Sequence, residues 1–277
     1  MMISATTTVP AALGTALLCV FVSTAVAQEK KETIYRVAPR AIVSISNNYG
    51  PITVKGSVPG QVVVNMTSYS LAVKFENEQH GNRIEMRVSS TANGDSLAEY
   101  IVRVPADAWV TMRSSSGGLR AEGLRGDLTL DAETGPIMVS DVRDAHLHLR
   151  SMSGPITLTG IHKSQVDVNS LSGNITLRDV VGSWAAVYSG TGRISYTGDP
   201  GTEGDYSLTT HTGDVEISIP ATSAVDIKPR SLNGEFSQEP LGSSAGVEQQ
   251  SLLPKSRMSR AVFLLRSLRG KIHVKRP

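Results

Sequence analysis

Cysteine and aromatic residues are scarce in this 277-residue chain: Cys19 is the only thiol, and Phe, Trp and Tyr together make up 5%. Long apolar runs are missing too. Residues 11–22 form a twelve-residue apolar run, short of the about 20 residues that a membrane span needs. Ala25-Val26-Ala27 follows, and this small-x-small pattern before a polar segment predicts a secretory signal peptide cleaved after Ala27. The predicted mature chain holds no thiol, which excludes disulfides, thiol catalysis and cysteine metal sites.

Cleavage would export the mature chain, residues 28–277, to the periplasm or the cell surface. Two alternatives stay open. The segment before the apolar run has no Lys or Arg, so an uncleaved anchor is one alternative. Lipidation of Cys19 is the other, although Leu18 stands where a lipoprotein signal has a small residue. No sorting signal separates the periplasm from the outer surface.

Glycine, by contrast, is abundant at 25 residues, and nine glycines share the sequence around them. Residues two and four after each glycine, and five and seven before it, are apolar almost throughout, with mostly polar residues between them. This alternation predicts short strands with one buried face on both sides of a turn. From the second to the eighth of these glycines the spacings are 18, 19, 19, 19, 21 and 21 residues. The nine are Gly50, Gly117, Gly135, Gly154, Gly173, Gly192, Gly213, Gly234 and Gly270.

An antiparallel hairpin explains one such unit, but not seven consecutive units at near-constant spacing. If each unit is one rung of a solenoid, like residues stack about 4.8 Å apart in parallel register. Ile137, Ile156, Ile175 and Ile194 should then form one buried column. The prediction is an all-β fold, a parallel β-solenoid with two short strands per rung of about 19–21 residues and extra N-terminal strands.

The turns have their own signature. A [Ser/Thr]-x-[Ser/Thr]-Gly motif recurs, as in residues 151–154 and 170–173. Ser and Thr hydroxyls bond nearby backbone groups at turns, and glycine is expected here for its left-handed conformation. A second turn is expected six to seven residues later, at Gly123, Gly160 and Asp179. Two strands and two turns per rung predict a flat cross-section of two sheets.

The spacing also divides the chain beyond the signal peptide. A single domain is expected over residues 28–277, in four parts. Strands that cap the N-terminal end occupy residues 28–109, because an open solenoid edge would aggregate. The regular rungs, a Gly- and Ser-rich flexible loop, and the last rung with a basic tail follow at 110–237, 238–260 and 261–277.

One family shows the same order of features. Segments 42–45, 50–54 and 102–105, then the Ser-x-Ser-Gly ladder, then segment 267–274 resemble the bacterial putative adhesin family. That family is an exported domain of unknown function related to auto-transporter adhesin heads, the GIN domains. The resemblance covers about residues 32–276. It implies a β-solenoid that serves as a non-catalytic scaffold in the envelope or at the cell surface, with an unknown ligand and no cofactor.

Candidate chemical sites are few. His146 and His148 on one strand face, with Asp167 on the next rung, have metal-ligand chemistry, but a solvated polar face is the preferred interpretation. An enzyme acting on acidic polysaccharide is the runner-up class, yet outward acids such as Asp167 and Asp214 are scattered. The prediction is therefore no catalytic and no metal-binding residue. The carboxylates of Asp199, Glu203 and Asp205 have the chemistry of a calcium-binding loop, but an ordinary loop is the preferred interpretation.

Charge gives the one hint of a partner. After Glu248 the chain has no acidic residue but eight Lys and Arg. Such a tail suits polyanions, while a solvated terminal rung is the alternative. Nucleic acid is the least favoured polyanion because aromatic residues do not alternate with the cations for base stacking, and Phe263 is expected to point into the core. The candidate polyanion-binding residues are Arg266, Arg269, Lys271, Lys275 and Arg276.

Overall fold

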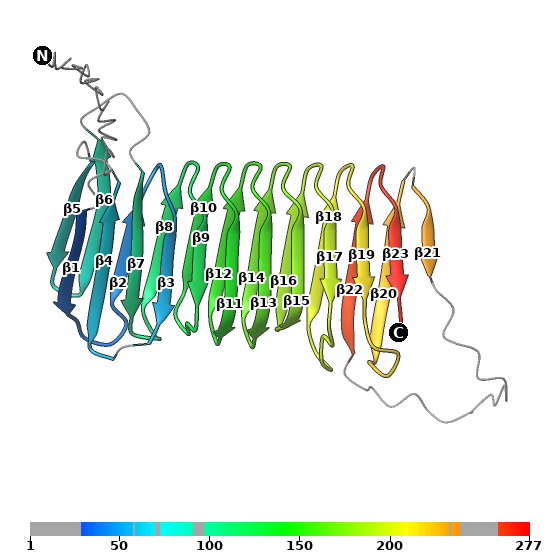
Figure 1. The fold of residues 1–277 in the computed structure, drawn as a ribbon. Helices are drawn as coiled ribbons and strands as arrows, with labels where there is room; N and C mark the ends of the chain where they lie inside the picture. The colour runs from blue at the N-terminus through cyan, green and yellow to red at the C-terminus, as the bar shows by residue number, and fades with distance from the viewer. Residues whose placement is uncertain (1–28, 58, 70–72, 91–96, 233, 239–259) are drawn as a thin grey trace, which may run out of the picture.

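The structure is a computed structural model that describes residues 29–57, 59–69, 73–90, 97–232, 234–238 and 260–277. The predicted signal peptide and nearly all of the predicted loop 238–260 lie outside these residues. The described residues form strands and connecting turns in two sheets, here sheet A and sheet B (Figure 1). None of them belongs to a helix that is long and apolar enough to cross a bilayer.

Sheet A has twelve strands and sheet B eleven. In spatial order, sheet A consists of β1 (Glu29–Arg36), β4 (Gln61–Ser68), β7 (Ala98–Val104), β3 (Ile52–Gly56), β9 (Leu119–Glu122), β11 (Ile137–Arg143), β13 (Ile156–His162), β15 (Ile175–Val181), β17 (Ile194–Thr197), β19 (Val215–Ser218), β23 (Ile272–Lys275) and β21 (Phe236–Gln238). Sheet B consists of β20 (Val225–Ser231), β22 (Ala261–Ser267), β18 (Asp205–Thr210), β16 (Trp184–Ser189), β14 (Gln165–Ser170), β12 (His146–Ser151), β10 (Leu128–Ala132), β8 (Trp109–Ser114), β2 (Ile42–Ser46), β6 (Arg83–Ser90) and β5 (Val73–His80).

The rungs from β8 to β19 confirm the predicted solenoid. Each rung gives one strand to sheet B and the next to sheet A, and neighbouring rungs pair in parallel (Figure 1). The expected isoleucine column exists, because Ile137, Ile156, Ile175 and Ile194 pair in register and are fully buried. Like residues therefore stack into continuous apolar columns between the sheets, and this shared core holds neighbouring rungs together.

The corner glycines are needed for a reason other than the predicted one. None of the glycines that close the motif in the regular rungs has a positive φ. Instead, a Cβ on Gly173 would lie 2.1 Å from the carbonyl oxygen of Gly154, and one on Gly154 would lie 2.0 Å from that of Gly135. From Gly117 to Gly213, each motif glycine thus rests directly on the motif glycine of the preceding rung, and only a residue without a side chain permits this approach.

Two of the three expected second turns, at Gly160 and Asp179, are bulges within strands, whereas Gly123 follows the end of β9 with a φ of 71°. Asp141, Gly160 and Asp179 have φ of 55°, 65° and 51°, and the ladder skips them while the residues on both sides stay paired. The extra residue shifts the alternation by one, so that Ile161 and Val180 point into the core again. Gly and Asp are among the residues that tolerate this left-handed conformation best.

Extra strands extend the N-terminal end, as predicted. β1, β4 and β7 pair antiparallel in sheet A, and β5 and β6 form an antiparallel hairpin in sheet B. The first complete rung in sequence, β2 with β3, therefore lies inside the stack, covered by β6 and β7.

The C-terminal end corrects the predicted order of rungs. The last rung in sequence, β22 with β23, does not end the stack. It is inserted between β18 with β19 on one side and β20 with β21 on the other (Figure 1). The glycines stack in the same order, since a Cβ on Gly270 would meet Gly213 and one on Gly234 would meet Gly270. Along the sequence, the outermost rung therefore comes before the rung that separates it from β18 and β19.

Candidate functional site

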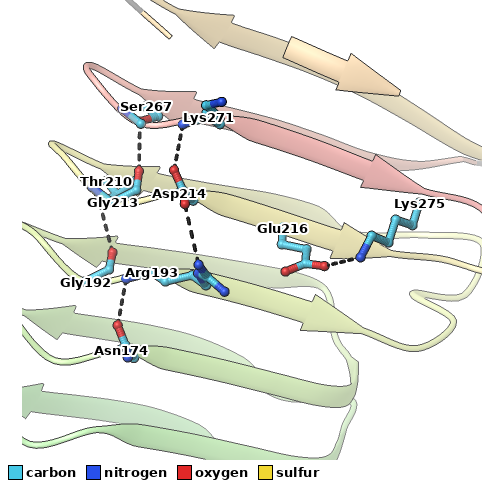
Figure 2. Close-up of polar contacts among 11 residues, drawn as sticks. Asn174, Gly192, Arg193, Thr210, Gly213, Asp214, Glu216, Ser267, Lys271 and Lys275 are labelled. Atoms are coloured by element: carbon cyan, nitrogen blue, oxygen red, sulfur yellow. Dashed lines mark hydrogen bonds and ion pairs between the residues drawn. The ribbon is translucent and has the colours of Figure 1, made fainter. Parts of the chain in front are cut away.

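Corner hydroxyl groups join the turns before β19 and β23 to the neighbouring rungs (Figure 2). The buried Thr210 hydroxyl donates to the carbonyl oxygen of Gly192 at 3.1 Å and accepts from the backbone N–H of Gly213 at 3.1 Å. Ser267 repeats this one rung further, donating to the carbonyl oxygen of Gly213 at 3.0 Å. The residues that follow these glycines therefore stack in one row on the outer face of sheet A.

That row is a ladder of polar contacts across five rungs, and Figure 2 draws it from Asn174 to Lys271. The Asn174 side chain accepts from the backbone N–H of Arg193 at 2.9 Å. Asp214 lies 3.6 Å from the Arg193 guanidinium and accepts from the backbone N–H of Lys271 at 2.8 Å. The ammonium of Lys271 in turn lies 2.9 Å from a carboxylate oxygen of Glu235 on the outermost rung. This pairing lowers the pKa of Glu235 and raises that of Lys271 through the hydrogen bond and the charge attraction.

A second group of polar side chains, Glu216, His273 and Lys275, lies beside this row on the outer face of sheet A. The Lys275 ammonium donates to Glu216 at 2.6 Å, and this hydrogen bond holds the pKa of the Glu216 carboxyl below its ordinary value (Figure 2). An open hollow of about 340 Å³ lies between the row and this group, lined by Arg193, Asp214, Glu216, His273 and Lys275. Opposite charges balance within this hollow, so it is not a basic surface.

The five candidate polyanion-binding residues lie on different faces. Arg266 points outward from sheet B, Arg269 is exposed at the corner, and Lys271 and Lys275 lie on the outer face of sheet A. Both lysines have carboxylate partners from the neighbouring rungs. Arg276 is half-buried, and its Nε has no hydrogen-bond partner within the described residues. The five therefore do not form one surface.

His273 makes the contact that most resembles catalytic chemistry. Its Nδ1 lies 2.6 Å from the Ser237 hydroxyl, and in register Glu216, His273 and Ser237 lie directly opposite one another on three adjacent strands. A nucleophilic triad needs the carboxylate to orient the imidazole. Glu216 instead bonds Lys275, so these residues do not connect as a triad.

The histidine pair is placed as the stacking predicted. His146 Nδ1 lies 3.0 Å from Asp127, and His148 Nδ1 lies 2.9 Å from Asp167. Each imidazole thus contacts a separate carboxylate. Across the described part of the chain, no group of three or more His, Cys, Asp or Glu side chains is arranged to hold a metal ion.

The acidic loop between β17 and β18 is held by its own contacts. Asp199 accepts from the backbone N–H of Gly201 and from the hydroxyl of Ser223, both at 3.0 Å. Glu203 and Asp205 line an open cavity of about 790 Å³ together with Lys163 and Arg260. The three carboxylates of this loop do not share one centre.

The acidic partners of the C-terminal lysines, Glu216 and Glu235, were not among the residues predicted from the sequence. Glu235 contacts Lys271 only because the rungs are stacked out of sequence order. One signal for that order is Pro229, in the middle of β20. Proline cannot donate to a ladder and is confined to edge strands, so it predicts that β20 lies at the edge.

Known proteins share the sequence pattern and the fold of this chain. The sequence profile of the family Toastrack DUF4097 matches residues 44–275. A putative adhesin from Parabacteroides merdae has the same fold, with a TM-score of 0.51 at 12% identity over 89% of this chain and 96% of the other. A putative adhesin from Parabacteroides distasonis matches with a TM-score of 0.51 at 13% identity over 89% and 97%. None of the curated proteins matches the chain.

Proposed function

Since this chain belongs to the Toastrack DUF4097 family, we propose that it is an exported, non-catalytic scaffold that binds a partner in the cell envelope or at the cell surface. The observation that carries the proposal is the in-register stack itself. Two flat outer faces, held by one buried core, present outward side chains in fixed rows. Such quasi-one-dimensional stacks provide extended binding surfaces.

Two further observations support a scaffold in the envelope. The two solved structures compared above are named putative adhesins, which suits a binding protein rather than an enzyme. The short apolar run at residues 11–22 with Ala25-Val26-Ala27 supports export. N-terminal sequencing of protein from the native host should recover a chain that starts at Gln28. Recovery of Met1 on a cytoplasmic species would contradict export.

Photo-crosslinking in the native host tests the scaffold directly. A photoreactive residue replaces outward Thr157 on sheet A or outward Gln165 on sheet B, both in the regular rungs. At least one position should yield an adduct with an envelope component. The matched control carries the probe at Lys55, toward the N-terminal end of sheet A. A chain that yields no adduct from either face, or that shortens a polysaccharide, contradicts a non-catalytic scaffold.

The charged C-terminal segment supports a narrower version of the polyanion hypothesis. Lys271 and Lys275 are engaged by carboxylates, whereas no ion pair joins Arg266 or Arg269 to an acid within the described residues. Anion binding by this segment is therefore expected from its sheet B side.

A further inference from the structure

Two large aromatic side chains lie exposed on the outer face of sheet B. Trp184 is 42% exposed and Tyr188 is 45% exposed, and both point outward from β16 with Ala186 between them. Four residues along a strand separate the two side chains by about 13 Å. Trp and Tyr are amphipathic residues that concentrate where a ligand or partner binds. The small side chain of Ala186 leaves the space between the rings open.

Two arginines lie in the same row as Tyr188. The row runs from Tyr188 through Thr209 to Arg266 and Arg230, on four adjacent strands. Arg266 and Arg230 are exposed and directly opposite each other, and no ion pair joins either to a carboxylate within the described residues. Like charges in this position are destabilising, so an anion bound between the two guanidinium groups would relieve their repulsion. Arginine also binds carboxylate and sulfate in bidentate geometry.

A preformed polar network lies on the other side of the rings. Asp167 accepts from the Asn169 amide at 3.0 Å and contacts His148 Nδ1 at 2.9 Å. Both oxygens of Asp167 are thus engaged, and Asn169 lies directly opposite Tyr188. The amide oxygen of Asn169 has no partner within the described residues. The Tyr188 ring therefore has an amide beside it on one side and Thr209, followed by the two arginines, on the other.

We propose that this surface, formed by Trp184, Tyr188, Arg266 and Arg230, binds an acidic glycan. One saccharide ring packs on Tyr188 while a carboxylate or sulfate on a neighbouring sugar lies between the arginines. The two strands from Tyr188 to Arg266 span about 10 Å, which suits adjacent sugars of one chain. The inference rests on the proposed function and names its ligand class.

The surroundings favour a glycan over a protein. A stable protein interface needs a wide apolar centre with charged groups at its rim. Around Tyr188 and the arginines the outward residues are small or polar, namely Ala186, Ser207 and Thr209, and only Leu264 is large and apolar. Asp205 and Val262 lie in the row of Trp184, so the acidic group of the glycan is assigned to the row of Tyr188. Isolated rings with directional polar groups between them suit a polyhydroxylated ligand instead.

Calorimetric titration of the exported protein tests the assignment. The probes are short oligosaccharides of galacturonate, alginate, hyaluronan and heparin, with maltohexaose as the neutral control and polyphosphate as the charge control. At least one acidic oligosaccharide should bind, more weakly as salt rises because the arginines are exposed. Tyr188→Ala, and Arg230→Ala combined with Arg266→Ala, should each weaken that binding at least about tenfold.

Matched variants separate this surface from general effects. Trp109→Ala removes an equally exposed tryptophan, 47% exposed, on the same face but four strands away, and should leave binding unchanged. Circular dichroism melting checks that all variants fold. Absence of binding to every acidic oligosaccharide overturns the inference. So does equal binding of polyphosphate that is lost only with the arginines. Neither result touches the proposed scaffold, whereas release of shortened oligosaccharides would contradict that function itself.

Discussion

The middle of the stack and its C-terminal end are built from the same motif but follow different rules of order. From β10 to β17, each rung rests on the rung that precedes it in sequence. At the C-terminal end, β22 and β23 rest on β18 and β19, although β20 and β21 come between them in the chain. The repeated motif therefore sets how a rung is shaped, but not which rung it contacts.

The difference follows from what makes a rung fit. A corner glycine and alternating apolar residues suit any neighbour that has the same pattern. What distinguishes the outermost rung is its poor fit to an interior position. Pro229 cannot donate to a ladder, and Phe236 occupies an inward motif position but is 46% exposed. In contrast, β22 brings Phe263 into the core, stacked on Tyr206 with ring centroids 4.5 Å apart.

The largest expected effect compares the same motif position inside and at the end of the stack. Ile175→Asp buries a carboxylate in the middle of the isoleucine column and should destabilise the fold by more than about 4 kcal/mol. Phe236→Asp alters the equivalent position on β21 and should cost about 1 kcal/mol, because the side chain is half exposed. Urea unfolding measures both. Equal losses for the two variants would show that the outermost rung is packed like the interior.

Corner glycines sharpen the same comparison. Gly173→Ala places a Cβ 2.1 Å from the carbonyl oxygen of Gly154, with rungs packed on both sides, and should cost about 2–3 kcal/mol. Gly234→Ala brings its Cβ within 2.0 Å of the carbonyl oxygen of Gly270, but no strand of the described residues pairs with the outer side of this rung, so the rung can move away. Its cost should be about 1 kcal/mol. Thermal unfolding followed by circular dichroism checks the order, which a larger loss for Gly234→Ala would reverse.

The sequence allows the rung to be predicted because every position within it repeats. The column of Ile137, Ile156, Ile175 and Ile194 follows from spacing alone. The reason for the corner glycine was predicted wrongly, because a tight turn and a close backbone contact select the same residue. The rung order at the C-terminal end was missed since it depends on contacts between distant segments. Two of its signals are visible in the sequence, Pro229 in β20 and Gln238, the polar residue at an inward motif position of β21.

The scattering of the candidate site has the same cause. The acid-free tail suggested a free basic surface, but the insertion of β23 between β19 and β21 brings carboxylates to both sides of it. Lys275 thereby meets Glu216, and Lys271 meets Glu235. Net charge along a segment does not reveal the charge around it when the neighbours come from elsewhere in the chain.

A smaller effect is expected at the corner hydroxyls. Ser189 is fully buried, accepts from the backbone N–H of Gly192 at 2.9 Å and donates to the carbonyl oxygen of Gly173 at 3.3 Å. Ser189→Ala leaves two buried backbone groups without these partners and should cost about 1–2 kcal/mol. Ser231, the equivalent on the outermost rung, is half-buried and accepts from Gly234. Ser231→Ala should cost less than half as much in the same urea unfolding experiment, and equal costs would contradict the comparison.

The smallest effect compares the two ion pairs on either side of β23. Lys275 and Glu216 face the interior rung with 44% and 32% of their side chains exposed, and Lys271 and Glu235 face the outermost rung with 56% and 78% exposed. Because Lys275 lowers the pKa of Glu216 in the folded state, the pair stabilises the fold at pH above the unfolded pKa of that carboxyl. This stabilisation is lost as the pH falls through the lowered folded pKa.

Lys275→Met should therefore cost about 0.5 kcal/mol at pH 7 and little at pH 3. Lys271→Met should show the same direction of pH dependence with a smaller amplitude, since the pKa of Glu235 is also lowered but its pair is more exposed to solvent. Unfolding free energies at both pH values test this, and a cost of Lys275→Met that persists at pH 3 would assign its role to packing of the side chain rather than to charge.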